Sequence, residues 1–321
     1  MQKMENPADD NLDSDQDIIR AEVVEVMPGA PWQWQEVRPV RPRRRWRPPL
    51  LLFVATCLST WLAGIDLQDG WRAGLLHGLR YAVPVMTILI CHEMGHFVQA
   101  WRYGVYASLP YFLPMPPPIS PIGTLGAVIV MEPRMGHRRA LFDIGITGPL
   151  AGLVPTLIFC VVGLHYSKPI IAAPTHEGWS YGAPLLFRFL AGHIVPQVPE
   201  ADMLVLDPMA FAGWVGLLVT SLNLIPIGQL DGGHILYALL RRKANRVASL
   251  LLLAALILVV LNWRTLGGWT LMIFLLMMMG STHPPTADDN EPLGAVRIVL
   301  GWLTLAFIFV GFTPTPILVP S

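Results

Sequence analysis

The chain has 321 residues, of which 53% are hydrophobic and 14% charged, and its formal net charge is zero. Soluble domains carry roughly a quarter charged residues, so this composition indicates a polytopic membrane protein in a lipid bilayer. The balanced charge gives no support for nucleic acid as a partner, and we expect none.

Residues 1–48 are expected to form a disordered cytoplasmic tail that ends beside the membrane. Its first part is acidic and lacks the apolar core of a signal peptide, and acidic residues this dense also argue against an organelle transit peptide. Six arginines then fall within residues 38–47. A nucleic-acid patch is one interpretation, but the apolar run from Leu50 favours a membrane-flanking anchor. A basic flank before the first span places the N-terminus in the cytoplasm.

Apolar segments continue along the chain, and we interpret residues 49–321 as one all-α membrane domain of about six or seven transmembrane helices with a small membrane-associated β-hairpin. The expected spans are residues 49–66, 78–101, 141–164, 208–226, 247–262, 268–280 and 295–312. Several are shorter than the ~20 residues that a straight helix needs to cross a bilayer, so the exact number of spans and the side of the C-terminus stay open. With seven spans, all but five of the 22 Lys and Arg residues fall on the cytoplasmic side, which supports the orientation.

The second expected span carries the sequence Cys91-His92-Glu93-Met94-Gly95-His96 after a long apolar run. Residues four apart lie on one face of a helix, so His92 and His96 can reach a single ion. Two imidazoles suit Zn²⁺, and Glu93 is then close enough to act on a water in the open coordination position. Ionisable groups at lipid depth are costly and mark a functional site. The alternative is a chance set of residues reaching back to the membrane surface.

Cysteine is not expected to contribute to this site. Cys57, Cys91 and Cys160 lie far apart inside apolar runs and lack C-x-x-C spacing, which predicts small buried side chains rather than disulfides or metal ligands. Cys91 adjoins His92, but successive side chains on a helix point apart, so Cys91 should not share that metal.

Residues 104–133 are not expected to form a transmembrane helix, because six prolines between Pro110 and Pro121 would break one. The following stretch, residues 123–131, is rich in β-branched side chains and predicts a short strand or hairpin that dips into the membrane from the cytoplasmic side. Backbone of this kind survives at lipid depth only under cover of protein or a wet cavity. Its free edge could pair with an extended peptide, and an ordinary hairpin without a substrate role is the alternative.

The third expected span opens with small residues, Gly145, Gly148 and Gly152, whose spacing lets helices approach closely. We expect these glycines to pack against another helix, with the metal-binding helix as the candidate. Residues 165–207 are expected to form an extracytoplasmic loop with an interfacial helix near residues 183–195.

The third metal ligand is expected where the fourth span ends. Pro226 and Gly228 break the helix there, and Asp231 can cap a new helix at about the depth of the two histidines. A His, His, Asp set leaves a fourth position for water, as catalytic zinc sites require. The alternative is a plain N-cap aspartate at the membrane surface.

Three further polar residues lie near or beyond this break. Asn223 could polarise a peptide carbonyl or hold the substrate backbone, and a hydrogen bond between helices is the alternative. His234 is expected to pack or to support the ligands without binding the metal. His283 is expected to lie in a cytoplasmic loop.

Together these motifs resemble the site-2 protease family of intramembrane zinc metalloproteases. H-E-x-x-H in one span and N-x-x-P-x-x-x-x-D-G in a later one, from Asn223 to Gly232, carry the resemblance over about residues 78–242, the expected catalytic core. The run from Gly228 to His234, with His-Pro-Pro-Thr and Glu-Pro-Leu-Gly downstream, is similar to the plastid and cyanobacterial-type branch. We expect neither the PDZ module nor the CBS pair that some relatives carry.

The resemblance implies a role for each motif residue: His92, His96 and Asp231 bind zinc, Glu93 is the base and acid, and Asn223 lies beside the substrate. It also implies hydrolysis of peptide bonds within or next to transmembrane segments of single-span membrane proteins, as in regulated intramembrane proteolysis. The acidic N-terminus departs from a plastid form, so a bacterial inner membrane is the expected location.

Two other functions are compatible with these residues. A zinc transporter or sensor would pass or hold an ion on the same side chains, but transporters show related halves, and the sequence contains no second H-E-x-x-H-like segment. An inactive homologue could act as a scaffold, although retention of Glu93 argues for catalysis. The sequence leaves open the substrate, the need for a prior cleavage, the gate and the oligomeric state.

Overall fold

The structure is a computed structural model that describes residues 46–68, 70–117, 119–131, 137–170, 180–196, 198, 203–315 and 317–318. The chain divides into two units, Met1–Arg41 and Pro42–Ser321, and every described residue belongs to the second. The expected tail lies outside the described residues up to position 45. Its boundary with a domain of residues 49–321 therefore stays a prediction.

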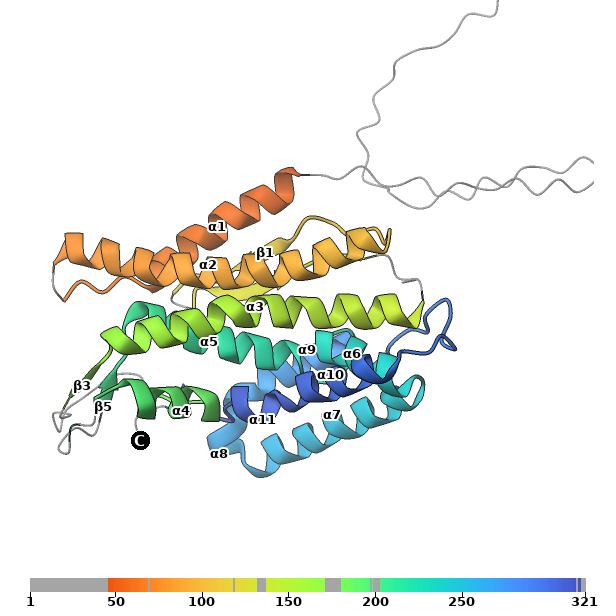
Figure 1. Cartoon of the computed structure of the whole chain (residues 1–321). Coiled ribbons are helices and arrows are strands. Elements are labelled where there is room, and N and C mark those ends of the chain that lie inside the picture. Colours follow the sequence, from red (N-terminus) through yellow and green to blue (C-terminus); the bar gives the residue numbers. More distant parts are fainter. Residues whose placement is uncertain are drawn as a thin grey trace, which may run out of the picture. The chain divides into compact units, whose positions relative to one another are not determined.

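The second unit consists mainly of helices (Figure 1). In chain order these are α1 (Arg47–Ala63), α2 (Trp71–Arg102), α3 (Arg138–Tyr166), α4 (Leu185–Ile194), α5 (Pro208–Asn223), α6 (Asp231–Leu240), α7 (Lys243–Leu261), α8 (Trp263–Leu266), the 3₁₀ turn η1 (Gly267–Trp269), α9 (Thr270–Met279), α10 (Ala295–Ala306) and α11 (Ile308–Gly311). The short strands are β1 (Tyr111–Pro114), β2 (Thr124–Val128), β3 (Lys168–Ile170), β4 (Ser180–Tyr181), β5 (Met203–Val205) and β6 (Ile317–Leu318). They form antiparallel pairs, β1 with β2, β3 with β5, and β4 with β6.

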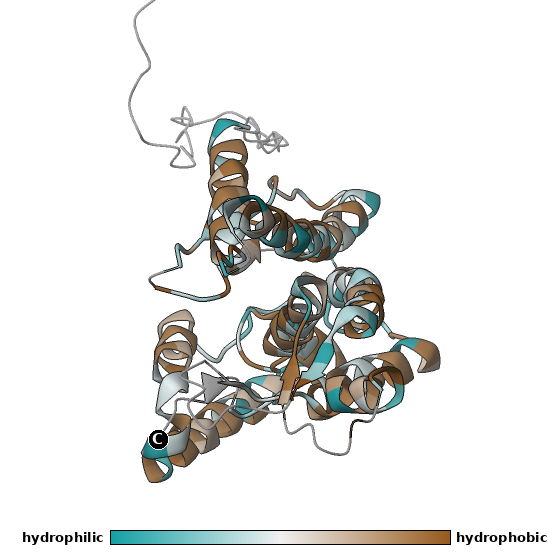
Figure 2. Ribbon diagram, turned by 90° about the vertical axis from the view of Figure 1, so that its left-hand side faces the viewer, coloured by the Kyte–Doolittle hydropathy of each residue, from teal (hydrophilic) through white to brown (hydrophobic). Residues whose placement is uncertain are grey.

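Within the described residues, three helices are long and apolar enough to cross a membrane: α2, α3 and α7. Hydrophobic residues, brown in Figure 2, prevail along the helices. The other expected spans correspond to shorter apolar helices, namely α1, α5, α9 and the pair α10 and α11. The helical class is therefore confirmed, whereas a count of six or seven spans stays a prediction.

Helices α2, α3 and α5 pack on one another and carry the interior of the unit (Figure 1). Glycines make the approach of α2 to α3 possible. A Cβ atom on Gly95 would stand 2.5 Å from the carbonyl oxygen of Thr147, and one on Gly152 would stand 3.0 Å from the Cβ of His92. A Cβ on Gly148 would collide with the ring of His96. The expected packing against the metal-binding helix is therefore confirmed for Gly148 and Gly152. Gly145 instead faces α6, where an added Cβ would stand 3.0 Å from the Cβ of His234.

The cysteines match their expected burial only in part. Cys160 of α3 is fully buried against α5, where a Cβ on Gly213 would approach its sulfur to 2.6 Å. Cys57 and Cys91 are half-buried.

The expected hairpin is present, and it starts earlier than the sequence suggested. Strand β1 lies inside the Pro-rich stretch, with Phe112 opposite Ala127 and a register shift just before Pro114. The turn is fixed to α1, where the hydroxyl of Ser59 donates a 2.6 Å hydrogen bond to the carbonyl of Gly123. Gly123 has φ 82° and touches the α1 backbone, so the position requires glycine.

The described part of residues 165–207 contains α4, which confirms the helix expected near residues 183–195. Strands β3 and β5, near the two ends of the same region, pair with each other. An ion pair of 2.7 Å between Arg80 and Asp207 ties the start of α5 to α2.

Candidate metal centre

The H-E-x-x-H residues lie in the C-terminal half of α2, as expected, and are deeply buried. His92, Glu93 and His96 have exposed fractions of 4%, 4% and 5%. The four-residue spacing puts both imidazoles on the face of α2 that packs against α3. The apolar surroundings make uncompensated polar groups expensive here, so the two rings require partners.

The break between α5 and α6 brings Asp231 to the same place. Helix α5 ends at Asn223, and the chain turns through Gly228, whose φ of 59° lies in the left-handed region, before α6 begins. The expectation that Asp231 caps this helix is wrong by one position. The N-cap is Leu230, and Asp231 is the first helical residue, so its carboxylate reaches the histidines instead of the α6 backbone.

The three side chains meet at distances typical of ligands around one ion. One Asp231 oxygen lies 3.1 Å from His92 Nε2, the other lies 3.3 Å from His96 Nε2, and the two Nε2 atoms are 3.2 Å apart. Tetrahedral ligands placed about 2.0 Å from zinc are separated from one another by ~3.3 Å. The donor set and its spacing therefore fit Zn²⁺ without rearrangement.

A backbone contact holds His96 in the tautomer that a metal ligand needs. His96 Nδ1 donates a hydrogen bond of 2.7 Å to the carbonyl oxygen of Ile144 in α3. Since a carbonyl only accepts, Nδ1 carries the proton and the Nε2 lone pair is directed toward Asp231 and His92. Helix α3 thus orients one ligand as well as covering it.

A cavity of about 350 Å³ opens onto this cluster. Its lining includes Glu93, together with the three candidate ligands. Asn223 lies at the end of α5 with its Nδ2 atom 3.2 Å from His92 Nε2, so the structure brings all five expected site residues together. The lining also includes residues 127–129, 131 and 283–286.

The structure adds one residue that the sequence assigned only to a loop. His283 is buried, with 8% of its surface exposed, and its Nε2 lies 2.7 Å from Nδ1 of His234. Both rings line the cavity, while the described ligand group comprises His92, His96 and Asp231. His234 and His283 are 49 residues apart, and no helix or strand periodicity relates positions so distant. The one sequence feature that marks His283 is the His-Pro-Pro run in which it lies.

The H-E-x-x-H side chains of α2 meet an aspartate from the break between α5 and α6, and the cluster lies between apolar helices. This arrangement defines a helical membrane protein with a candidate metal centre. The sequence profile of Peptidase family M50 matches residues 80–262, more than half of the chain, and the chain belongs to this family. The resemblance to site-2 proteases is thereby confirmed.

The relatives include plant proteins of the plastid type. The chain is 30% identical over 223 residues to the probable zinc metalloprotease EGY1, chloroplastic, of Oryza sativa subsp. japonica, which covers 68% of this chain and 38% of the relative. It is 29% identical over 248 residues to the probable zinc metalloprotease EGY2, chloroplastic, of Arabidopsis thaliana, covering 75% and 43%. The chain thus spans less than half the length of these relatives. No solved structure matches it.

Proposed function

We propose that the chain is an intramembrane zinc metalloprotease that hydrolyses peptide bonds within or next to the transmembrane segments of single-span membrane proteins. The observation that carries this proposal is the cluster of His92, His96 and Asp231, in which each side chain has an atom 3.1–3.3 Å from the next, with Glu93 in the lining of the same cavity. Membership of Peptidase family M50 and the names of the relatives point to the same chemistry.

Each residue of the cluster has a defined task in this reaction. His92, His96 and Asp231 would hold zinc, which when bound polarises the peptide carbonyl and acidifies a water molecule. Glu93 takes a proton from the attacking water and later returns it to the leaving amine. Asn223 donates its amide N–H to the carbonyl oxygen on which negative charge develops.

The hairpin supports the presentation of a substrate. The backbone carbonyls of a transmembrane helix accept hydrogen bonds from N–H groups of the same helix and are shielded from attack. The helix must therefore unwind locally before a peptide bond can be cleaved. Strand β2 pairs with β1 on one side, and Ala127 and Val128 border the cavity. An extended segment that adds to the edge of β2 would regain backbone hydrogen bonds next to Glu93.

The decisive experiment replaces the proposed base. Purified full chain is incubated with a synthetic single-span peptide of about 24 residues, made of Leu and Ala with a central Asn-Gly pair, in detergent micelles. The Glu93→Gln variant should bind one zinc ion like the parent but cleave at least about 100-fold more slowly, because the proton acceptor is lost. Zinc is counted by elemental analysis and cleavage by mass spectrometry. Cleavage by this variant at the parental rate would show that Glu93 is not the base.

The alternative of a zinc transporter is separated from proteolysis by a flux measurement. Proteoliposomes that contain the parent should show no zinc flux above the Asp231→Ala variant if the ion stays at a catalytic site. Flux that depends on Asp231, without cleavage of any peptide, would favour transport. Among the described residues, one group of potential metal ligands is present rather than a series across the membrane.

We also propose a bacterial inner membrane as the location, with the N-terminus in the cytoplasm. The acidic start of the sequence supports the location, and the arginines before the first span support the orientation. Protease protection of an N-terminal tag in inverted membrane vesicles would test it. A tag that is cleaved only in right-side-out vesicles contradicts the orientation.

A further inference from the structure

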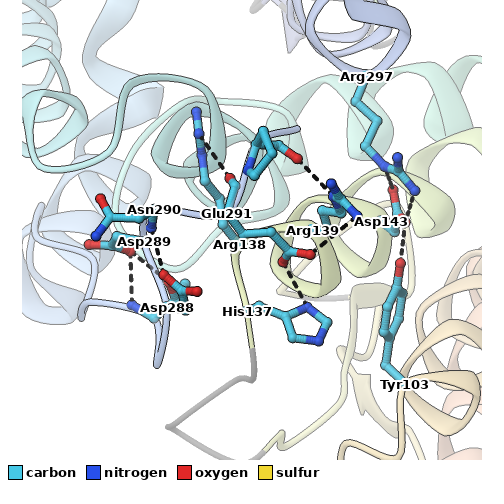
Figure 3. A network of polar contacts seen from close by, with 12 residues as sticks. Tyr103, His137, Arg138, Arg139, Asp143, Asp288, Asp289, Asn290, Glu291 and Arg297 are labelled. Carbon is cyan, nitrogen blue, oxygen red and sulfur yellow. Dashed lines mark hydrogen bonds and ion pairs between the residues drawn. The ribbon is translucent and has the colours of Figure 1, made fainter. Parts of the chain in front are cut away.

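One wall of the metal-site cavity comes from residues 280–294, the connection between α9 and α10, which we call the strap. The strap is fastened to the N-terminus of α3. The backbone N–H of Arg138 donates to the carbonyl of Asp288 over 3.2 Å, and the Glu291 carboxylate lies 3.3 Å from the guanidinium of Arg139 (Figure 3). These contacts fix the segment that carries His283 into the cavity wall.

The ring of His283 is held in one orientation. It stacks on Tyr237 of α6 with ring centroids 4.6 Å apart, and its Nδ1 lies 2.6 Å from the carbonyl oxygen of Pro284. Its backbone N–H donates to the Asn245 side chain of α7 over 3.0 Å. One face of the ring, one ring nitrogen and the backbone N–H are therefore committed to structural contacts.

These contacts decide where the protons of the two histidines lie. The carbonyl of Pro284 can only accept, so Nδ1 of His283 carries a proton. Burial lowers the pKa of His283 below its ordinary value, against the opposing effects of the Pro284 carbonyl and Asp289, which favours the neutral ring. Nε2 of neutral His283 must then accept, and the donor 2.7 Å away is Nδ1 of His234.

His234 in its neutral form is left with a bare Nε2. Among the described residues this atom has no hydrogen-bond partner, and the ring lines the cavity three residues after Asp231. A peptide extended in the cavity presents backbone N–H groups that have lost their helical partners and need acceptors. The acceptors next to His234 are otherwise engaged, because the oxygens of Asp231 face His92 and His96.

We propose that His234 is a substrate-binding residue whose Nε2 accepts a hydrogen bond from a backbone N–H of the peptide beside the scissile bond, and that His283 positions it by fixing this tautomer. The proposal rests on the proposed proteolytic function and assigns to it a specific contact. His234 touches the substrate, whereas His283 acts through His234.

The first test uses ring replacements and a matched control. His283→Phe keeps the stack on Tyr237 but removes both ring nitrogens, and His234→Phe removes the acceptor itself. In both variants the KM for the single-span Leu/Ala peptide should rise about 3- to 10-fold, the effect of one hydrogen bond, with one zinc ion retained and kcat within about 2-fold. His193→Phe, an exposed ring on α4, is the control and should leave KM unchanged.

The second test locates the N–H group. Peptides in which single amide N–H groups are replaced by ester oxygens are compared in the parent and in His234→Phe. At one position the ester should raise KM in the parent and have no further effect in the variant, because the acceptor is already gone. An ester scan that costs the two proteins equally at every position overturns the proposal while leaving proteolysis established. A parent that holds zinc but cleaves no peptide overturns both.

The third test reads the tautomer without any substrate. Nitrogen-15 spectra of histidine-labelled, zinc-loaded protein should show His234 protonated at Nδ1 and bare at Nε2, and His283→Phe should shift this signal toward the other tautomer. A merely structural role of His283 would change thermal stability without moving that signal. Protonation of His234 at Nε2 in the parent would overturn the proposal directly.

Discussion

The two walls of the metal-site cavity are built by different means. The ligand wall, formed by α2 and α6 and backed by α3, relies on close packing of glycines and apolar side chains, and its His92, Glu93 and His96 are deeply buried. The other wall, formed by the hairpin and the strap, relies on hydrogen bonds and ion pairs between partly exposed residues. Close packing fixes ligand positions because it admits few alternative arrangements, whereas exposed polar contacts exchange readily with water. The ligand wall therefore sets the chemistry, and the other wall is suited to admit a substrate.

A substitution in the ligand wall should have the largest effect. Gly148→Ala places a methyl group where the His96 ring lies, so the ring must turn away from Asp231. We expect zinc affinity to fall at least about 100-fold and cleavage to be lost, which metal analysis and the peptide assay measure. Gly268→Ala is the control, because nothing lies within 4 Å of the added atom. Normal zinc content in Gly148→Ala would show that the ligand wall yields more easily than its packing indicates.

Asn223 tests the border between metal binding and catalysis. Asn223→Ala should retain zinc, because the amide is not part of the ligand group, yet lower kcat by about 100-fold through loss of a donor to the charged transition state. Zinc titration and steady-state kinetics separate the two effects. Loss of zinc from this variant would assign Asn223 to the ligand wall instead.

Arg138 joins the two walls and should have an intermediate effect. Its buried guanidinium donates to the carbonyls of Ala238 and Leu239 at the end of α6 and to the carbonyl of Glu291 in the strap. Arg138→Met keeps the apolar stem but leaves these carbonyls without their donor, and we expect a loss of about 1–3 kcal/mol in the free energy of unfolding. Thermal melts in detergent measure the change. An unchanged melting temperature would mean that water replaces the guanidinium at no cost.

The smallest effect is expected at the strap itself. Burial acts to raise the pKa of Asp289, but hydrogen bonds from Thr286 and Tyr237 outweigh it and hold the pKa below its ordinary value. A depressed carboxyl pKa contributes stability above the unfolded value, about 3.8, and this contribution is lost as the pH falls through the folded value. The protection of strap amides from hydrogen exchange, taken relative to the intrinsic exchange rate at each pH, should therefore fall on acidification in the parent. In Asp289→Asn the protection should already be lower at neutral pH and change less.

The sequence was most informative where spacing or a helix break determines geometry. H-E-x-x-H predicted the shared face of His92 and His96, and the Pro226 and Gly228 break predicted where Asp231 turns inward. The hairpin was predicted because the density of prolines in residues 104–133 opposes a helix and because residues 123–131 are rich in β-branched side chains. The predicted N-cap role of Asp231 failed because a shift of one residue at a helix start redirects a side chain, and sequence patterns do not resolve that shift.

The number of spans and the contacts of the strap could not be predicted from spacing and helix breaks. Helices α1, α5 and α9 are apolar but too short to be assigned as spans by their length alone. Which of their surfaces face other helices depends on the tertiary fold, and a window of the sequence does not contain that information. The contact of His283 with His234 joins positions 49 apart through tertiary packing of the strap on α6. Periodicity describes one element at a time and carries no information about such a contact.

The bare stripe of glycines on α3 has a consequence for protein engineering. Copying the two histidines and the aspartate into an unrelated bundle would not reproduce this centre, since a partner helix with ordinary side chains would push the imidazoles apart. A transplant has to include the glycine-lined face of α3 and the carbonyl of Ile144. Together they leave room for the imidazoles and fix the orientation of His96.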